Sequence, residues 1–204
     1  MSARFFQVVY FLNPAMQRKL DSIRFIAEPT EKARTHVTVG GPFDDASHVK
    51  KPTLQTQGSS LHILGVGSFF SERQNTVFLK CDSEYLKRVW NKKHYGYNPH
   101  ITIYDGSDRD FAVSLYQELN RQRIFFNVQI GDVELLSTVK GQQAFDLMLA
   151  VDWDFIRWAA GRSIDNLSVR HFMPWERKMI IYRMLSRLTH DDEQYIPSSA
   201  SALG

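Results

Sequence analysis

Thr35-His-Val-Thr-Val-Gly-Gly41 and Pro99-His-Ile-Thr-Ile-Tyr-Asp-Gly106 contain the same four-residue pattern: a histidine, an aliphatic residue, a threonine and a second aliphatic residue. The two histidines, His36 and His100, are 64 residues apart. If residues were placed at random, this composition would give about 0.005 such patterns per chain. Two occurrences in one chain therefore indicate that the two stretches share a role.

Each pattern is typical of a β-strand. Successive side chains of a strand point to opposite faces, so the histidine and the threonine share one face and the two aliphatic residues share the other. The aliphatic residues anchor the strand in a core. Two such strands around a common centre would bring together two imidazoles, His36 and His100, and two hydroxyls, Thr38 and Thr102.

This set of groups suits a phosphodiester. One neutral imidazole can take a proton from a hydroxyl or a water, and a protonated imidazole can give a proton to the leaving oxygen. The ordinary histidine pKa of about 6.5 allows both forms near neutral pH. Each proton transfer typically contributes about 10²–10⁴ in rate. The threonine hydroxyls can donate hydrogen bonds to the non-bridging phosphate oxygens.

The composition is ordinary for a globular protein: 204 residues, of which 43% are apolar and 23% charged. The net charge of +3 permits a phosphate-bearing partner without requiring one. The single cysteine, Cys81, excludes an internal disulfide and suits a reducing compartment. The apolar stretch 5–12 is too short to span a bilayer and has no signal-peptide cleavage pattern. We therefore expect a cytoplasmic protein without a membrane segment.

The order of predicted elements indicates an α+β fold with mainly antiparallel sheets, because helices and strands mix without strict alternation. The two motifs occupy similar positions in two halves, which predicts a bilobal, pseudo-twofold arrangement over residues 1–151. Residues 152–204 are expected to form a helical C-terminal extension with a frayed tail. Strands are predicted at 5–12, 36–39, 61–70, 76–81, 100–104, 124–130, 133–139 and 145–151, and helices at 15–27, 83–93, 108–122, 154–160 and 174–188.

The motifs resemble those of the two-histidine phosphoesterase superfamily, which includes RNA 2′,3′-cyclic phosphodiesterases and the proteins called 2′–5′ RNA ligases. His36-Val-Thr-Val-Gly-Gly-Pro-Phe43 is similar to the family form H-x-T-x-x-G-P-F, and Pro99-His-Ile-Thr-Ile103 also matches. The resemblance covers about residues 3–151.

The resemblance implies a bilobal antiparallel α+β fold in which both motifs face a central groove. It also implies an enzyme that needs neither metal nor nucleotide cofactor. His36 and His100 would be the catalytic acid–base pair, and Thr38 and Thr102 would bind the phosphate. The substrate would be a nucleotide or an RNA end with a cyclic phosphate or a 2′–5′ linkage.

One feature departs from the family pattern. Many ligase-like relatives have a basic residue shortly after the second motif, whereas this chain continues with Tyr104-Asp105-Gly106. The acidic residue argues against a ligase-type RNA substrate.

Several residues near the motifs are candidates for substrate contacts. The aromatic side chains of Phe43, Tyr97 and Tyr104 could stack on a nucleobase or could serve packing. Tyr104 would face the same side as the second motif if the strand alternation continues. Lys92 and Lys93 could meet phosphates or could form a solvated helix end.

Three alternatives compete with this interpretation. A zinc site needs three or four ligands, and neither histidine has a carboxylate, cysteine or further histidine two or four residues later, so we predict no metal. The histidines could be purely structural, although their shared frame argues against this. The same groove could also bind RNA or a nucleotide without turnover.

The sequence alone does not select the substrate. Candidate substrates are an RNA end, an ADP-ribose cyclic phosphate, a cyclic dinucleotide and a 2′–5′ oligonucleotide. The sequence leaves open the direction of the reaction, which histidine is the acid, and the oligomeric state. Residues 152–204 could cap the groove, form a dimer contact or complete the core.

Overall fold

The structure is a computed structural model that describes residues 4–30, 33–49, 58–72, 74–92, 96–137, 150–164 and 166–193. Its elements in chain order are β1 (Phe5–Phe11), α1 (Pro14–Ala27), β2 (Val37–Phe43), the 3₁₀ turn η1 (Ala46–His48), β3 (Ser59–Ser71), β4 (Gln74–Asp82), α2 (Glu84–Val89), β5 (His100–Asp105), α3 (Arg109–Asn120), β6 (Phe126–Ser137), α5 (Trp153–Ala160), α6 (Asn166–Val169) and α7 (Pro174–Glu193).

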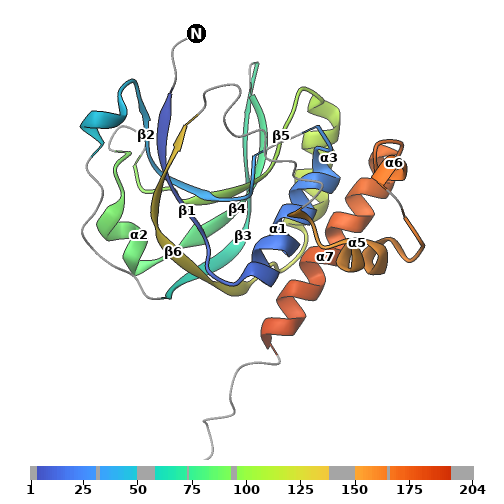
Figure 1. Cartoon of the computed structure of the whole chain (residues 1–204). Helices are drawn as coiled ribbons and strands as arrows, with labels where there is room; N and C mark the ends of the chain where they lie inside the picture. The colour runs from blue at the N-terminus through green and yellow to red at the C-terminus, as the bar shows by residue number, and fades with distance from the viewer. Residues whose placement is uncertain are drawn as a thin grey trace, which may run out of the picture.

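The strands of the described residues form one closed antiparallel sheet in the order β1-β2-β5-β4-β3-β6, and β6 returns to pair with β1. Helices α1, α3, α5 and α7 lie on one side of the sheet and α2 on the other (Figure 1). The predicted mixed α+β class with antiparallel pairing is confirmed. Two separate lobes are not seen, because β2 of the first motif pairs directly with β5 of the second. That pairing joins the strands of both halves into a single sheet.

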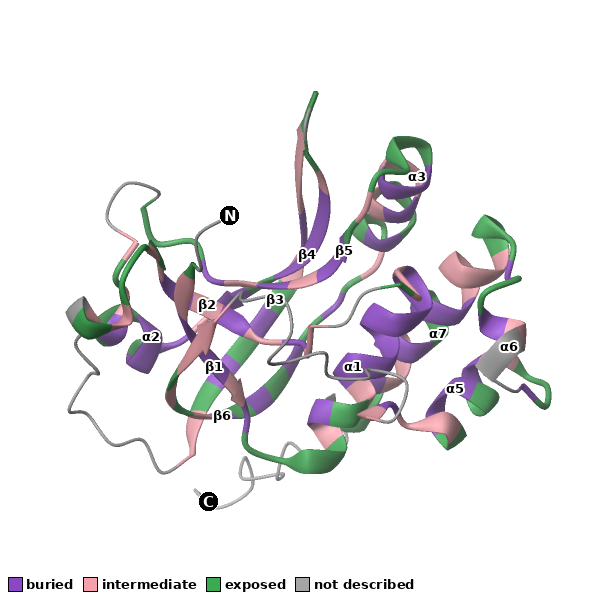
Figure 2. Ribbon diagram, turned by 45° about the horizontal axis from the view of Figure 1, so that its top comes forward, coloured by how far each residue is buried: buried purple, intermediate pink, exposed green. Residues whose placement is uncertain are grey.

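The two faces of the sheet differ in character. Buried residues alternate with less buried ones in the first half of β6, near the start of β3 and in the motif segments of β2 and β5, whereas β1 and β4 contain runs of buried residues (Figure 2). The buried face belongs to one hydrophobic cluster that also contains the apolar sides of the helices. The histidine and threonine of each motif are partly exposed, whereas the aliphatic residues beside them, Val37, Val39, Ile101 and Ile103, are buried.

The C-terminal helices belong to the same hydrophobic cluster as the sheet. α7 contributes Ile180, Ile181, Met184, Leu185 and Leu188, all of them buried. Of the roles left open for residues 152–204, completing the core is therefore one that α5 and α7 perform. Within the described residues, no helix has both the length and the apolar character that crossing a bilayer requires.

Local signals account for where several helices begin. Asn13 accepts hydrogen bonds from the backbone N–H groups of Ala15 and Met16, and Pro14 occupies the first turn of α1. Asp108 accepts a hydrogen bond from the N–H of Phe111 at the start of α3. These caps satisfy backbone donors that have no partner inside the helix.

Some predicted element boundaries are wrong. β2 runs past residue 39 to Phe43, with Gly41 at a φ of 102°, a conformation that glycine adopts without strain. α2 ends at Val89 rather than near residue 93. The predicted strand at 145–151 lies outside the described residues except for its last two, which are not in a strand.

The two strands predicted at 124–130 and 133–139 are a single strand, β6. Its first half pairs with β3 and its second half with β1. The break expected near Gly131 is the point at which this strand changes partner.

Candidate active site

The two motifs lie on neighbouring antiparallel strands. Val37 of β2 pairs with Ile101 of β5, and both side chains are buried in the core. This register aligns residue 36 with residue 102 and residue 38 with residue 100. Each histidine therefore lies opposite the threonine of the other motif, and all four side chains are partly exposed.

Sheet geometry sets the distances within this arrangement. Directly opposite residues of an antiparallel pair have Cβ atoms about 4.5–5.5 Å apart, and diagonal neighbours are about 7–8 Å apart. His36 and His100 are diagonal neighbours in this register.

Both imidazoles are oriented in the same way. Nδ1 of His36 lies 2.7 Å from the carbonyl oxygen of Arg34, and Nδ1 of His100 lies 2.9 Å from that of Asn98. Each bond reaches the residue two positions earlier. A carbonyl oxygen can only accept, so Nδ1 carries the hydrogen in both rings. Nε2 is thus the nitrogen that can accept or donate the proton in a reaction.

A buried polar network fixes the segment before His36. Asp21 of α1 is fully buried and accepts hydrogen bonds from the backbone N–H of Thr35 and from the side-chain amide of Gln17. Its second oxygen lies 3.5 Å from Nε of Arg34. Burial raises the pKa of the Asp21 carboxyl, and the bonds from Thr35 and Gln17 and the charge of Arg34 act against this rise. The network positions the Arg34 carbonyl that orients His36.

A second set of contacts fixes the segment before His100. The hydroxyl of Tyr97 donates to Asp82 at 2.9 Å, and it lies within hydrogen-bond distance of the backbone of Ser83. These bonds tie the residue before Asn98 to the start of α2. On the other side of the motif, Arg24 of α1 donates to the carbonyl oxygen of Thr102 at 3.4 Å. Helix α1 therefore contacts the chain at both motifs.

His100 lies among aromatic rings. Its ring centroid is 4.8 Å from that of Phe78 and 5.4 Å from that of Phe69. Phe78 fits there because its neighbour in β3 is Gly67, where a Cβ atom would lie 2.4 Å from the Phe78 ring. Burial lowers the pKa of His100, and the nearby charge of Lys92 lowers it further. The imidazole is therefore neutral at pH 7.

His36 has different surroundings. Its ring meets the edge of Tyr10 at a centroid distance of 6.0 Å, and the guanidinium of Arg34 lies 5.6 Å from the centre of the Tyr10 ring. Burial, followed by the charge of Glu134, raises the pKa of the Tyr10 hydroxyl, so the phenol stays neutral at pH 7. The two imidazoles thus have similar backbone contacts but unequal neighbours.

Tyr104, one of the predicted substrate-binding aromatics, lies in the core. A register shift between Val77 and Phe78 makes β5 bulge, so Tyr104 pairs with Val77 and packs on Phe111 at 5.1 Å. Only 2% of its surface is exposed. The prediction that it faces the same side as His100 is therefore wrong, because the bulge breaks the alternation.

The other two predicted aromatics lie beside the motifs in sequence without joining the four motif side chains. Phe43 is at the far end of β2, paired with Phe5. Tyr97 keeps 39% of its surface exposed, but its hydroxyl is bonded to Asp82 and the Ser83 backbone. Its observed contacts support the second motif rather than extend the site.

The charged residues near the second motif have defined positions. Asp105 accepts a hydrogen bond from the hydroxyl of Thr76 and acts to raise the pKa of His100, against the effect of burial. Lys92 is half-buried, and burial lowers its pKa. Its ammonium group lies 5.9 Å from the centre of the Trp90 ring. Lys93 lies outside the described residues.

Sequence reasoning missed the aromatic neighbours of both imidazoles. Tyr10, Phe69 and Phe78 come from β1, β3 and β4, far from the motifs in sequence. The only available signal was their position in apolar strand segments, which equally indicates a core. It also missed Asp21. The helical spacing of Asp21 and Gln17 indicates a buried network only when the contact of Asp21 with Thr35 is known.

Within the described residues, no group of three or more histidine, cysteine, aspartate or glutamate side chains could hold a metal ion. A comparison of the chain with protein-family models finds no match. A comparison with curated proteins finds none that is significantly similar. The resemblance to two-histidine phosphoesterases therefore rests on the sequence motifs alone.

Proposed function

We propose that the protein is a metal-independent phosphodiesterase that hydrolyses a cyclic phosphate or a 2′–5′-type linkage of a nucleotide or RNA end. The observation that carries the proposal is the pairing of Val37 with Ile101, which sets each histidine opposite the threonine of the other motif. The arrangement has a local twofold character around that pair.

The unequal surroundings of the imidazoles support a division of roles. His100 is neutral at pH 7 because burial lowers its pKa, so its Nε2 can act as the general base. His36 then acts in its protonated form as the general acid through its own Nε2. A matched pair of this kind works when one ring is neutral and the other protonated at the same pH.

In the proposed reaction, a water oxygen forms a bond to phosphorus while Nε2 of His100 takes one of the protons of that water. The bond from phosphorus to the ribose oxygen breaks, and Nε2 of His36 gives that oxygen a proton. Thr38 and Thr102 donate hydrogen bonds to the non-bridging oxygens as negative charge develops on them. A water exchanges the proton between the two rings before the next turnover.

The way in which the two imidazoles are held favours catalysis over binding alone. Both rings are held by a backbone carbonyl that fixes the tautomer, and an anion-binding site does not need this. The partly exposed rings of Tyr10 and Phe69 beside the two imidazoles support a nucleotide substrate, because a base can stack on an aromatic face.

The test is hydrolysis of 2′,3′-cyclic nucleotides and 2′–5′-linked dinucleotides in the presence of EDTA. We expect turnover by the wild type and a loss of at least about 10² in kcat for His36→Asn and for His100→Asn. Thr38→Val and Thr102→Val, which keep the side-chain shape, should lose about 10-fold or more each. His62→Asn is the matched control, because His62 is a strand histidine without a threonine two residues later.

Turnover that is indifferent to both motif histidines, or that requires a metal, would overturn the proposal. No turnover of any of these substrates, together with RNA binding that weakens in the histidine variants, would instead favour a binding module that uses the same face.

A further inference from the structure

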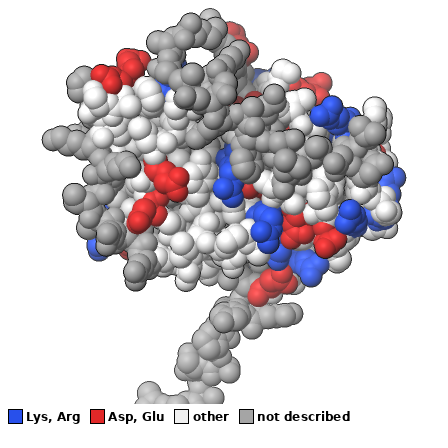
Figure 3. All heavy atoms as spheres, viewed as in Figure 1, with Lys and Arg blue, Asp and Glu red and all other residues white. Residues whose placement is uncertain are grey.

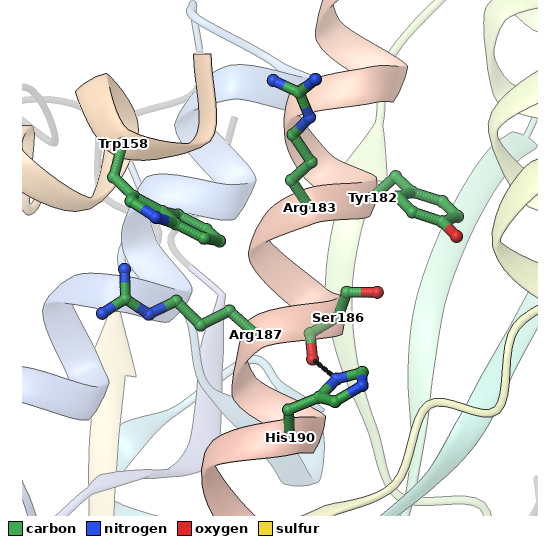
Figure 4. A pocket seen from close by; sticks show the side chains of 6 residues that line it. All are labelled: Trp158, Tyr182, Arg183, Ser186, Arg187 and His190. Carbon is green, nitrogen blue, oxygen red and sulfur yellow. Dashed lines mark hydrogen bonds between the residues drawn. The ribbon is translucent and has the colours of Figure 1, made fainter. Parts of the chain in front are cut away.

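We propose that the outer surface between α5 and α7 is a second binding site, for single-stranded RNA. The site lies on the C-terminal helices, outside the segment that resembles the phosphoesterases. It is an open pocket of about 500 Å³. Figure 4 shows its lining side chains, all from α5 and α7: Trp158, Tyr182, Arg183, Ser186, Arg187 and His190.

Two planar groups form the centre of this site. The guanidinium of Arg187 lies over the indole of Trp158, with 4.3 Å between its carbon and the ring centroid. Trp158 is 48% exposed although it is a large apolar residue. Such a pair holds the arginine flat at the surface. Bases of single strands stack on aromatic rings and on guanidinium planes in this way.

The charges around the planar pair suit phosphates. Arg183 and His190 lie on the exposed side of α7, and Nη1 of Arg183 donates to the carbonyl oxygen of Ala159 at 3.0 Å. No ion pair of Arg183 is found among the described residues, so its charge is available to an anion. The facing acidic group is Asp191, which lies 3.8 Å from Nε of Arg187 and 4.0 Å from Lys19.

The wider surface has both signs of charge over the side of the molecule where α5 and α7 lie (Figure 3). Within the pocket itself the charged side chains are arginines. Exposed aromatic side chains beside two arginines, of which Arg183 has no ion pair among the described residues, fit an alternating polymer of bases and phosphates. The choice of RNA among such ligands rests on the proposed function.

The pocket is distinct from the two-histidine site. It lies on α5 and α7, whereas the motif side chains lie on or directly before β2 and β5. Its occupant therefore takes no part in the reaction. The site would hold a segment of RNA away from the reacting end.

The test measures binding of a fluorescein-labelled single-stranded RNA of mixed sequence to the full-length protein. Trp158→Ala should weaken binding by roughly 5- to 100-fold, as loss of a stacked base does. Arg187→Gln and Arg183→Gln should weaken it and should each lower the slope of log K against log salt by about 0.7. Trp175→Ala, another strongly exposed tryptophan at the start of α7, and Arg157→Gln, an arginine of α5 outside the pocket, are the matched controls.

The same variants are assayed for hydrolysis of a 2′,3′-cyclic mononucleotide, which is too short to occupy both sites. Unchanged hydrolysis with weakened RNA binding supports the second site. RNA binding that depends on Trp158 and Arg187 in a protein without hydrolytic activity would still support it, and only the proposed function would then fail. Binding that changes no more in the pocket variants than in the controls would overturn the inference. Circular dichroism identifies any variant that fails to fold, and the conservative Trp158→Phe then replaces Trp158→Ala.

Discussion

At the scale of single residues, the site depends on how each imidazole is held and on what surrounds it. His36 and His100 make the same backbone hydrogen bond, to the carbonyl oxygen two residues earlier. His100 lies against two phenylalanine rings, whereas His36 meets the edge of Tyr10. Identical motifs therefore acquire different electrostatic surroundings, which is what an acid–base pair requires.

The first prediction concerns the titration of His100. Its pKa should lie below the ordinary value of 6.5, because burial disfavours the charged ring. The measurement is an NMR titration of the imidazole Cε1–H, assigned with His100→Asn. A midpoint at or above 6.5 would contradict the assignment of His100 as the neutral base.

This shift also predicts the sign of a stability change. The unfolded chain takes up the proton at a higher pH than the folded chain, so the contribution of His100 to stability is present above the unfolded pKa. It is lost as the pH falls from 6.5 toward the lower folded pKa. Acidification through that window should lower the melting temperature of the wild type more than that of His100→Asn. An equal drop in both proteins would contradict the prediction.

The second prediction concerns the network below the first motif. Asp21→Ala leaves the buried Thr35 N–H and the Gln17 amide without their acceptor. The free energy of unfolding should fall by about 3 kcal/mol. Asp21→Asn keeps one oxygen acceptor and should cost less. Urea unfolding measures both, with the exposed Asp154→Asn as the control expected to change stability by less than about 0.5 kcal/mol.

Activity measurements distinguish a positioning role of Asp21 from a purely structural one. If Asp21 positions His36 through Arg34, the folded Asp21→Asn protein should lose kcat while KM changes little. A loss of stability with full activity would show that the network serves the fold alone.

At the scale of elements, the pairing of strands decides which residues meet. The bulge in β5 moves Tyr104 into the core, whereas the regular register at Val37 and Ile101 aligns the motifs. Gly67 of β3 pairs with Phe78 of β4. The position of the Phe78 ring next to His100 thus depends on the absence of a side chain at Gly67.

The third prediction tests this dependence. Gly67→Ala would place a Cβ atom 2.4 Å from the Phe78 ring, so the ring must move away from its present position against His100. We expect a loss of about 1–3 kcal/mol in the free energy of unfolding, together with reduced hydrolysis. Gly131→Ala is the matched strand control, since the nearest heavy atom to its Cβ would be 3.8 Å away. Equal effects of the two substitutions in urea unfolding would contradict the role of Gly67.

At the scale of the whole molecule, the C-terminal helices and the sheet share one hydrophobic cluster. The C-terminal extension was expected from the order of elements along the chain. The packing of α7 makes that segment part of the core. We therefore expect the sheet and α7 to unfold together.

The fourth prediction follows from this shared core. Ile181 is fully buried in α7, and Ile181→Ala should cost about 2–5 kcal/mol. Native-state hydrogen exchange should show the same loss of protection for the buried amides of β4 as for those of α7. Met173→Ala, at a 56% exposed residue near the start of α7, is the control. Loss of protection confined to α7 would indicate a separately folding extension.

Local sequence signals predicted much of the fold. The helix at 15–27, the helix at 108–122 and most strands follow from hydrophobic spacing. The prediction failed where partners far apart in the chain decide the outcome. β6 was divided into two strands because its change of partner cannot be seen from its own residues.

The sequence by itself identified the four motif residues. It also determined that the histidine and threonine of each motif share one face of their strand, because strand alternation is a local property. It also determined which aliphatic residues anchor each motif. Only the tertiary structure decided that the motifs pair with each other, that Tyr104 is buried, and that Phe69, Phe78 and Tyr10 flank the imidazoles. These features depend on strand register, which arises from contacts between distant segments.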